Sequence, residues 1–215
     1  MRYLITGASG GIGRALVSQL APAHDVVAVS RTAYLLTGPG VTAVVLDLAA
    51  DPASWQLPSF DRLDGLVHCA GAVRPGRIDA LDASDWTWQL TVNAVGPALL
   101  TSRLLPVLRA ARGAVVFVNS GSGQRARAGM ASYGASKFAA RALADGLREE
   151  EPSLRVTTVY PGRTDSEMQR AVRAYEGGPF EPSQYLRPET VAGVIAQVLA
   201  TPPDAVVPVV VVRPR

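Results

Sequence analysis

The chain of 215 residues has the length of one domain, and its 48% hydrophobic against 18% charged residues exclude a disordered protein. One cysteine and two distant histidines exclude a disulfide framework and suggest no metal cluster, so we expect no metal. The net charge of +3 rests on scattered basic residues, which argues against nucleic-acid binding. No apolar run approaches a membrane span and strand-like sequence begins at Arg2, so we expect a soluble, cytoplasmic protein with no membrane partner.

Short, nearly continuous apolar segments alternate with longer helical patterns along the chain. Such apolar segments are typical of strands that helices cover on both faces. We expect strands at residues 3–6, 26–29, 41–46, 66–68, 114–119, 156–159 and 206–212. We expect helices at residues 12–20, 84–110, 132–149 and 188–199. The alternation predicts an α/β fold, a Rossmann-type doubly wound three-layer sandwich around a mostly parallel seven-stranded sheet, formed by residues 1–215 as one domain.

A glycine-rich segment, Thr6-Gly7-Ala8-Ser9-Gly10-Gly11-Ile12-Gly13, joins the first strand to the first helix. Glycines let the backbone approach a phosphate, and the helix start offers free N–H groups and a partial positive charge. The G-x-G-x-x-G spacing is absent, and a turn without a ligand is the alternative. Its place between a strand and a helix favours dinucleotide binding. The cofactor contacts expected here are Gly7, Ser9, Gly11, Ile12 and Gly13.

The second predicted strand ends in Val29-Ser30-Arg31. An acidic residue at this place would bind the adenosine ribose of NAD. Ser30 stands there instead, and the guanidinium of Arg31 suits a 2′-phosphate through paired, charge-assisted hydrogen bonds. A surface arginine at a strand end is the alternative. We therefore expect NADP(H) to be preferred over NAD(H).

A tyrosine and the only lysine of the chain stand four residues apart. Tyr133 and Lys137 follow a strand and a glycine-containing loop, and their spacing places them on one face of a helix. Every other basic residue is an arginine, which suggests that Lys137 stands where arginine cannot serve. To exchange protons near neutral pH, the pKa of a tyrosine must fall from about 10, and a nearby ammonium can lower it. We expect Lys137 to lower the pKa of Tyr133.

Taken together, these motifs resemble the short-chain dehydrogenase/reductase family in its compact single-domain form. The glycine spacing, the Tyr133–Lys137 pair and Pro161-Gly162 after the sixth strand occur in the family order over nearly the whole chain. The resemblance implies a single NAD(P)-binding domain that reversibly reduces a small-molecule carbonyl to an alcohol. Tyr133 would donate the proton, and Lys137 would also hold the nicotinamide ribose.

The resemblance extends to further site residues. Ser120, thirteen residues before Tyr133, would polarise the carbonyl, while Ser122 is a less well spaced competitor. The family's Asn-Asn-Ala-Gly appears here as His68-Cys69-Ala70-Gly71, with its last two residues facing the cofactor. The other expected cofactor contacts are Asp47 and Leu48 at the adenine, and Pro161, Gly162 and Thr164 after the sixth strand.

Asn93 matches the fourth catalytic residue of the family, in the long helical segment. Pro97 has no N–H, so the carbonyl of Asn93, four residues earlier, loses its helical partner and can hold a water molecule. In the family such a water links the lysine to solvent. An ordinary proline kink is the alternative reading.

The sequence departs from the family where the helix usual between Asp47 and His68 looks truncated, and where Thr164 stands earlier than the family often places it. Residues 163–187 look like an irregular lid or substrate loop, and the substrate is left open. The arginines in the loops that border the cleft suit an anionic or carrier-bound substrate, or reflect composition alone; they are Arg74, Arg77, Arg125 and Arg127.

Alternatives remain for the activity and the assembly. Gly7, Gly10 and Gly13 also match the family's epimerase/dehydratase branch, and a catalytically silent NADP-binding regulator would have the same fold. Small residues along 135–146 permit close packing of that helix, which the family pairs across a two-fold axis. We expect a homodimer or homotetramer.

Overall fold

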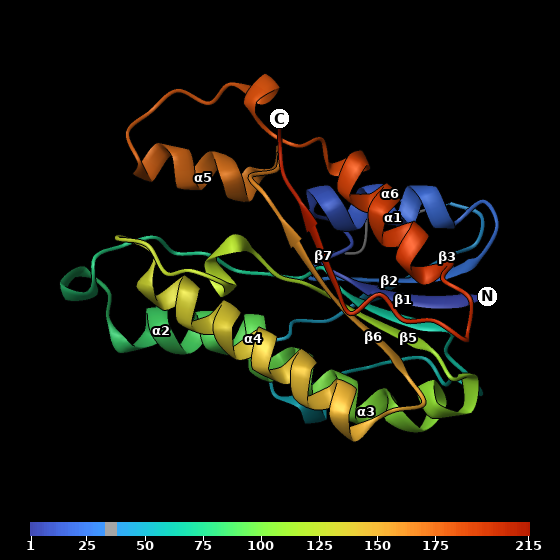
Figure 1. Cartoon of the computed structure of the whole chain (residues 1–215). Coiled ribbons are helices and arrows are strands. Elements are labelled where there is room, and N and C mark those ends of the chain that lie inside the picture. Colours follow the sequence, from blue (N-terminus) through green and yellow to red (C-terminus); the bar gives the residue numbers. More distant parts are fainter. Residues whose placement is uncertain (33–37) are drawn as a thin grey trace.

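The computed structural model describes residues 1–32 and 38–215 and contains one seven-stranded parallel sheet (Figure 1). The strands are β1 Arg2–Thr6, β2 Asp25–Ser30, β3 Val41–Val45, β4 Gly65–His68, β5 Ala114–Val118, β6 Arg155–Pro161 and β7 Val209–Val212. Their spatial order is β3-β2-β1-β4-β5-β6-β7, so the chain reverses direction across the sheet between β1 and β4. Ligands bind beyond the carboxyl ends of the strands at such a point. The predicted Rossmann-type fold is confirmed.

Helices cover both faces of the sheet. The helices are α1 Gly11–Leu20, α2 Ala83–Leu90, α3 Gly96–Ala111, α4 Ala131–Glu150, α5 Glu167–Tyr175 and α6 Pro188–Leu199. Neighbouring strand residues alternate between two cores: Ile5 packs with Leu16 of α1, whereas Leu4 packs with Leu100 of α3. Each large aliphatic side chain buried in this way stabilises the fold by roughly 1.5–3 kcal/mol. In the described part of the chain, no helix is long and apolar enough to cross a membrane.

The single long helix expected over residues 84–110 is wrong in detail, because it is broken into three parts. A π-helical turn at Thr91–Val95 separates α2 from α3, and the N–H of Gly96 donates to the carbonyl of Thr91, five residues earlier. A Cβ on Gly96 would lie 2.7 Å from the Leu48 carbonyl oxygen, so the turn brings the helix backbone directly against the segment after β3. Pro97, which lacks an N–H, follows at once.

Residues 163–187 are more regular than expected. They contain α5, which Ser166 caps by accepting the N–H of Gln169, and a 3-10 turn at Pro182–Gln184. Figure 1 shows α5 beyond the end of β6, well separated from α2 and α4. The last strand is shorter than expected and begins at Val209, after Pro208.

The connection from β3 to β4 contains no α-helix, as the sequence indicates; only a 3-10 turn at Pro52–Ser54 occurs there. The buried indole of Trp55 packs on the sheet face that a helix in this connection would otherwise cover. It donates its N–H to the Asp47 carbonyl at 2.9 Å. This bond fixes the segment that follows β3 at the carboxyl edge of the sheet.

Candidate active site

The start of α4 carries the buried pair Tyr133 and Lys137. The Lys137 Nζ lies 5.8 Å from the centre of the Tyr133 ring and donates to the carbonyl of Val118 at 3.2 Å. Val118 is the last residue of β5. The single ammonium of the chain is therefore held between the end of a central strand and the phenol.

Ser120 stands just beyond β5, near Tyr133. Its Oγ accepts the N–H of Ser122, the competing serine, at 3.1 Å. The side chain of Asn119 fixes this segment to α4: its Oδ1 accepts the Ser120 N–H at 2.8 Å, and its Nδ2 donates to the Lys137 carbonyl at 3.0 Å. The predicted hydroxyl, phenol and ammonium thus lie together at one edge of the sheet.

The electrostatics of the pair differ from the expectation. Burial raises the pKa of the Tyr133 phenol above its ordinary value, and hydrogen bonding with Ser120 opposes this effect. Burial also lowers the pKa of Lys137 to about 8, opposed by Cys69, whose own thiol pKa burial raises to about 12. The expected lowering of the Tyr133 pKa by Lys137 is not what the structure gives, because burial raises this pKa by more than the hydrogen bond with Ser120 lowers it.

The Asn93 side chain is fully occupied in the structure. Its Oδ1 accepts the Ala72 N–H, and its Nδ2 donates to the Ala72 carbonyl and to Ser136, each at 2.8 Å. The Ser136 hydroxyl in turn donates to the Tyr133 carbonyl at 2.7 Å. The Asn93 side chain therefore holds the loop after β4 against α4. Its backbone carbonyl is the group left for the predicted water.

The glycine turn between β1 and α1 is tightly packed. A Cβ on Gly13 would lie 2.2 Å from the Gly7 carbonyl oxygen, and Gly7 itself has φ +65°. α1 begins without a side-chain cap and without an acidic residue in its first turn. Its N–H groups thus suit an anion, and the residues present fit the pyrophosphate of a dinucleotide. Ser9 and Ile12, both half-buried, flank this helix start.

The other expected cofactor contacts line the same edge. Ala70 lies against the turn, 2.6 Å from a Cβ placed on Gly7, and donates its N–H to Thr6 Oγ1 at 3.2 Å. A Cβ on Gly71 would lie 3.4 Å from Asn93 Oδ1 and 3.6 Å from Lys137 Nζ. The segment Ala70–Gly71 therefore connects the glycine turn to Asn93 and Lys137.

At the end of β2, Arg31 is exposed while Ser30 is buried. The Ser30 hydroxyl exchanges hydrogen bonds with the backbone of Thr32, so it shapes the turn. Asp47 is exposed and accepts the Ala49 N–H at 2.8 Å, whereas Leu48 is buried beside it. Among the described residues of this corner, Arg31 is the exposed cation.

The segment after β6 reaches back to the glycine turn. Pro161 ends β6, and Gly162 donates its N–H to the Val212 carbonyl at 2.7 Å. Thr164 is buried and its hydroxyl donates to the Gly162 carbonyl at 3.0 Å. Ser166 lies closer to the turn, with its Cβ 3.4 Å from a Cβ placed on Gly11.

Comparison with known proteins decides the family. The model of the family described as short chain dehydrogenase matches residues 2–177. The chain belongs to the short-chain dehydrogenase family. A curated relative, 2,3-dihydro-2,3-dihydroxybenzoate dehydrogenase of Escherichia coli, is 35% identical over 176 residues, which cover 78% of this chain and 71% of the relative.

Solved structures agree with this assignment. The enzyme KRED1-Pglu is 28% identical, with a TM-score of 0.84 over 97% of this chain and 99% of its own. A serine dehydrogenase complexed with NADP+ has a TM-score of 0.87 over 98% and 94% of the two chains; at 24% identity it shows the fold alone. The chain is thus an oxidoreductase of the short-chain dehydrogenase family.

The structure adds residues to this short-chain dehydrogenase site that sequence reasoning missed. Asn119, Ser136 and Ser166 take part through contacts between segments far apart in the chain. Ser166 had a local signal, since a serine before a helical pattern predicts an N-cap. Nothing in the local sequence marks the contacts of Asn119 or Ser136.

The arginines near the site fall into two groups. Arg74 forms an ion pair with Asp85 and stacks on Trp88, and Arg77 forms an ion pair with Asp79 at 3.0 Å. Arg125 and Arg127 lie in an exposed run before α4. The first two arginines are therefore engaged within their own segment of this short-chain dehydrogenase.

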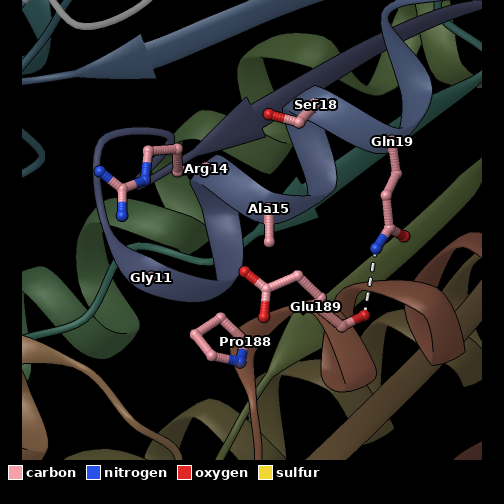
Figure 2. Close-up of a pocket in the computed structure, with 7 residues that line it drawn as sticks. All are labelled: Gly11, Arg14, Ala15, Ser18, Gln19, Pro188 and Glu189. Carbon is pink, nitrogen blue, oxygen red and sulfur yellow. Dashed lines mark hydrogen bonds between the residues drawn. The ribbon is translucent and has the colours of Figure 1, made fainter.

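A separate pocket of about 250 Å³ lies between α1 and the start of α6. Figure 2 shows its lining, including Arg14 and Glu189, with Gln19 donating to the Glu189 carbonyl at 3.1 Å. The pocket borders the glycine turn through Gly11 but contains none of the four predicted catalytic residues.

Proposed function

We propose that this protein is an NADPH-dependent reductase that reversibly converts a small-molecule carbonyl compound to an alcohol. One observation carries the proposal: Tyr133, Ser120 and Lys137 lie together, buried or half-buried, at the sheet edge where the glycine turn opens. A silent regulator of the same fold would not need this set, and its intactness favours catalysis.

Each side chain has a role in the proposed reaction. Tyr133 donates its phenolic proton to the carbonyl oxygen, and the Ser120 hydroxyl hydrogen-bonds to the same oxygen. Lys137 attracts the negative charge that develops on the phenol and holds the ribose next to the nicotinamide. A bound nicotinamide would supply the hydride. The carbonyl of Asn93 positions the water that returns a proton toward Lys137.

The direction of the pKa shifts supports a role in reduction. Burial raises the pKa of Tyr133, so the phenol keeps its proton at neutral pH and is ready to donate it. Lys137, with a pKa of about 8, is mostly charged at pH 7. Because this pKa lies close to neutral pH, the ammonium can release its proton and take it up again.

The preference for NADPH rests on the end of β2. Arg31 is exposed there, and the place of the ribose-binding carboxylate is taken by a serine that bonds to its own turn. The serine dehydrogenase of similar fold is complexed with NADP+. We also propose that the cofactor contacts the glycine turn and three further segments. These segments are Ala70–Gly71, Asp47–Leu48 and Pro161–Thr164.

The test is consumption of NADPH with a panel of aldehydes and ketones, and of NADP+ with the matching alcohols. We expect turnover that requires both cofactor and carbonyl compound. Tight NADPH binding without turnover of any compound would favour a regulator instead. The cytoplasmic location and the homo-oligomer also stay predictions, which cell fractionation and light scattering would test.

A further inference from the structure

Helix α5 carries one apolar face. Met168, Val172 and Tyr175 stand at positions i, i+4 and i+7, so their side chains follow one another along the same face of the helix. Val172 in the middle is buried, while Met168 and Tyr175 at the two ends remain partly exposed. Figure 1 shows α5 beyond the end of β6 and away from α2 and α4.

The inner end of this face lies at the catalytic residues. The methyl carbon of Met168 is 3.6 Å from a Cβ placed on Gly71, and Lys137 Nζ and Asn93 Oδ1 lie 3.6 and 3.4 Å from the same point. Met168 is therefore a neighbour of the ammonium and of the loop after β4.

The outer end lies against a second loop. The Tyr175 hydroxyl oxygen and Cε1 are 2.9 and 3.0 Å from a Cβ placed on Gly129, so any side chain there would displace the ring. Gly129 has φ +72°, and its carbonyl accepts the Gly76 N–H at 2.8 Å. Tyr175 thus meets the point where the loop after β4 and the loop before α4 are joined.

Contacts within residues 163–187 fix the position of α5. Glu176, the residue after Tyr175, pairs with Arg163 at 2.5 Å and with Arg173. Arg170 stacks on Phe180 with its guanidinium carbon 4.0 Å from the ring centre, and Phe180 stacks on Tyr185 at 4.7 Å. These contacts stabilise α5 in the position that brings Tyr175 against Gly129.

We propose that Tyr175 determines substrate size by closing the outer end of the substrate site. The inference rests on the proposed function. Tyr175 stands seven positions after Met168 on the helix, a distance of about 10 Å along its axis. A carbonyl compound held at Tyr133 and Ser120 has an apolar helix face beside it and an aromatic ring at the far end. The substrate is a compact, largely apolar aldehyde or ketone, and a substrate on a long carrier arm is excluded.

The test compares straight-chain methyl ketones of increasing length, from butanone upward, in the wild type and in Tyr175→Ala. We expect kcat/KM in the wild type to fall once the chain exceeds about 10 Å, and the fall to move to longer chains in Tyr175→Ala. For the longest ketones the variant should exceed the wild type by at least about tenfold, while the shortest ketones change little.

Tyr175→Phe is the matched control, because it keeps the ring and removes only the hydroxyl. Its length profile should follow the wild type. An unchanged profile in Tyr175→Ala, or a wild type that reduces the longest ketones as well as the shortest, would overturn the size limit and leave the proposed function intact. A wild type that reduces no carbonyl compound would overturn the proposed function, and this inference with it.

Discussion

Single residues set the chemistry at the two ends of the proposed cofactor site. At the adenosine end, NAD and NADP differ by one phosphate, and Arg31 is the exposed cation at the end of β2. A charge-assisted hydrogen bond at such a site gives a preference of roughly tenfold or more. At the nicotinamide end, the buried Tyr133 and Lys137 would exchange protons in the proposed reaction.

Arg31→Ala should remove the preference for NADPH. We expect the wild type to favour NADPH over NADH by at least about tenfold in kcat/KM, and the variant to lose most of this factor through a higher KM for NADPH. Arg62→Ala is the control, since Arg62 is also exposed but stands before β4, at the opposite edge of the sheet from the proposed cofactor site. Steady-state kinetics at low salt decide the matter; a wild type with equal efficiency for both cofactors would show that Arg31 does not bind the phosphate.

The buried lysine should make stability depend on pH. The pKa of Lys137 is lowered from 10.5 to about 8, so between these values the unfolded chain keeps a proton that the folded chain releases. The free energy of unfolding therefore rises with pH through this window, by up to about 3 kcal/mol, and the buried charge costs most below it.

Urea unfolding at several pH values, in the wild type and in Lys137→Met, measures this contribution. The difference between the two proteins should grow in favour of the wild type from about pH 8 to 10.5. Parallel curves for the two proteins would mean that Lys137 is not a buried, neutralisable amine.

At the scale of elements, the sequence predicts the strands of the sheet well, but it predicts poorly where helices are interrupted or added. The five inner strands β2, β1, β4, β5 and β6 are short apolar runs buried on both faces, so their pattern is local and readable, whereas the edge strands β3 and β7 are partly exposed. The π-helical turn at Thr91–Val95 depends on the close approach of Gly96 to Leu48, a contact between distant segments. Helix α5 is short and stands between Gly162 and Gly177, so turn signals conceal its apolar face.

The same distinction holds for the site. Tyr133, Lys137 and the glycine turn are recognisable because their chemistry depends on spacing within one segment. The raised pKa of Tyr133 was not predictable, because burial depends on everything packed around the phenol. The role of Asn119 likewise depends on how β5 and α4 meet.

The π-helical turn also bears on proton transfer. Pro97→Ala supplies the N–H that the Asn93 carbonyl lacks in a regular helix, and this N–H would compete with the predicted water. We expect kcat to fall by about tenfold, less than the loss of a general acid costs, with cofactor affinity unchanged. The solvent isotope effect on kcat should rise at the same time. A variant with the wild-type kcat would show that the water relay does not use this carbonyl.

At the scale of the whole molecule, an exposed apolar patch favours self-association. Val95 and Leu99 are one helical turn apart and Phe138 stands on α4; all three are more than two-fifths exposed. Segment 91–95, which carries Val95, packs against α4, which carries Phe138. We expect this patch to pair two copies.

Phe138→Glu should weaken the assembly by placing a charge in that interface. Light scattering at micromolar concentration should show a dimer or tetramer for the wild type and a smaller species for the variant. Val45→Glu is the control, because Val45 is even more exposed than Phe138, at 58% against 41%, but lies on β3 at an edge of the sheet. A wild type that is already a monomer would contradict the proposed pairing.

The central claim is that Tyr133 donates the proton in a reaction driven by NADPH, and Tyr133→Phe tests it most directly. The variant removes one hydroxyl from a buried ring, so the fold and the affinity for NADPH should persist, the latter measured by fluorescence titration. With a carbonyl compound that the wild type reduces, kcat should fall at least a hundredfold, the contribution of a general acid. A variant that keeps more than about a tenth of the wild-type kcat would contradict the account.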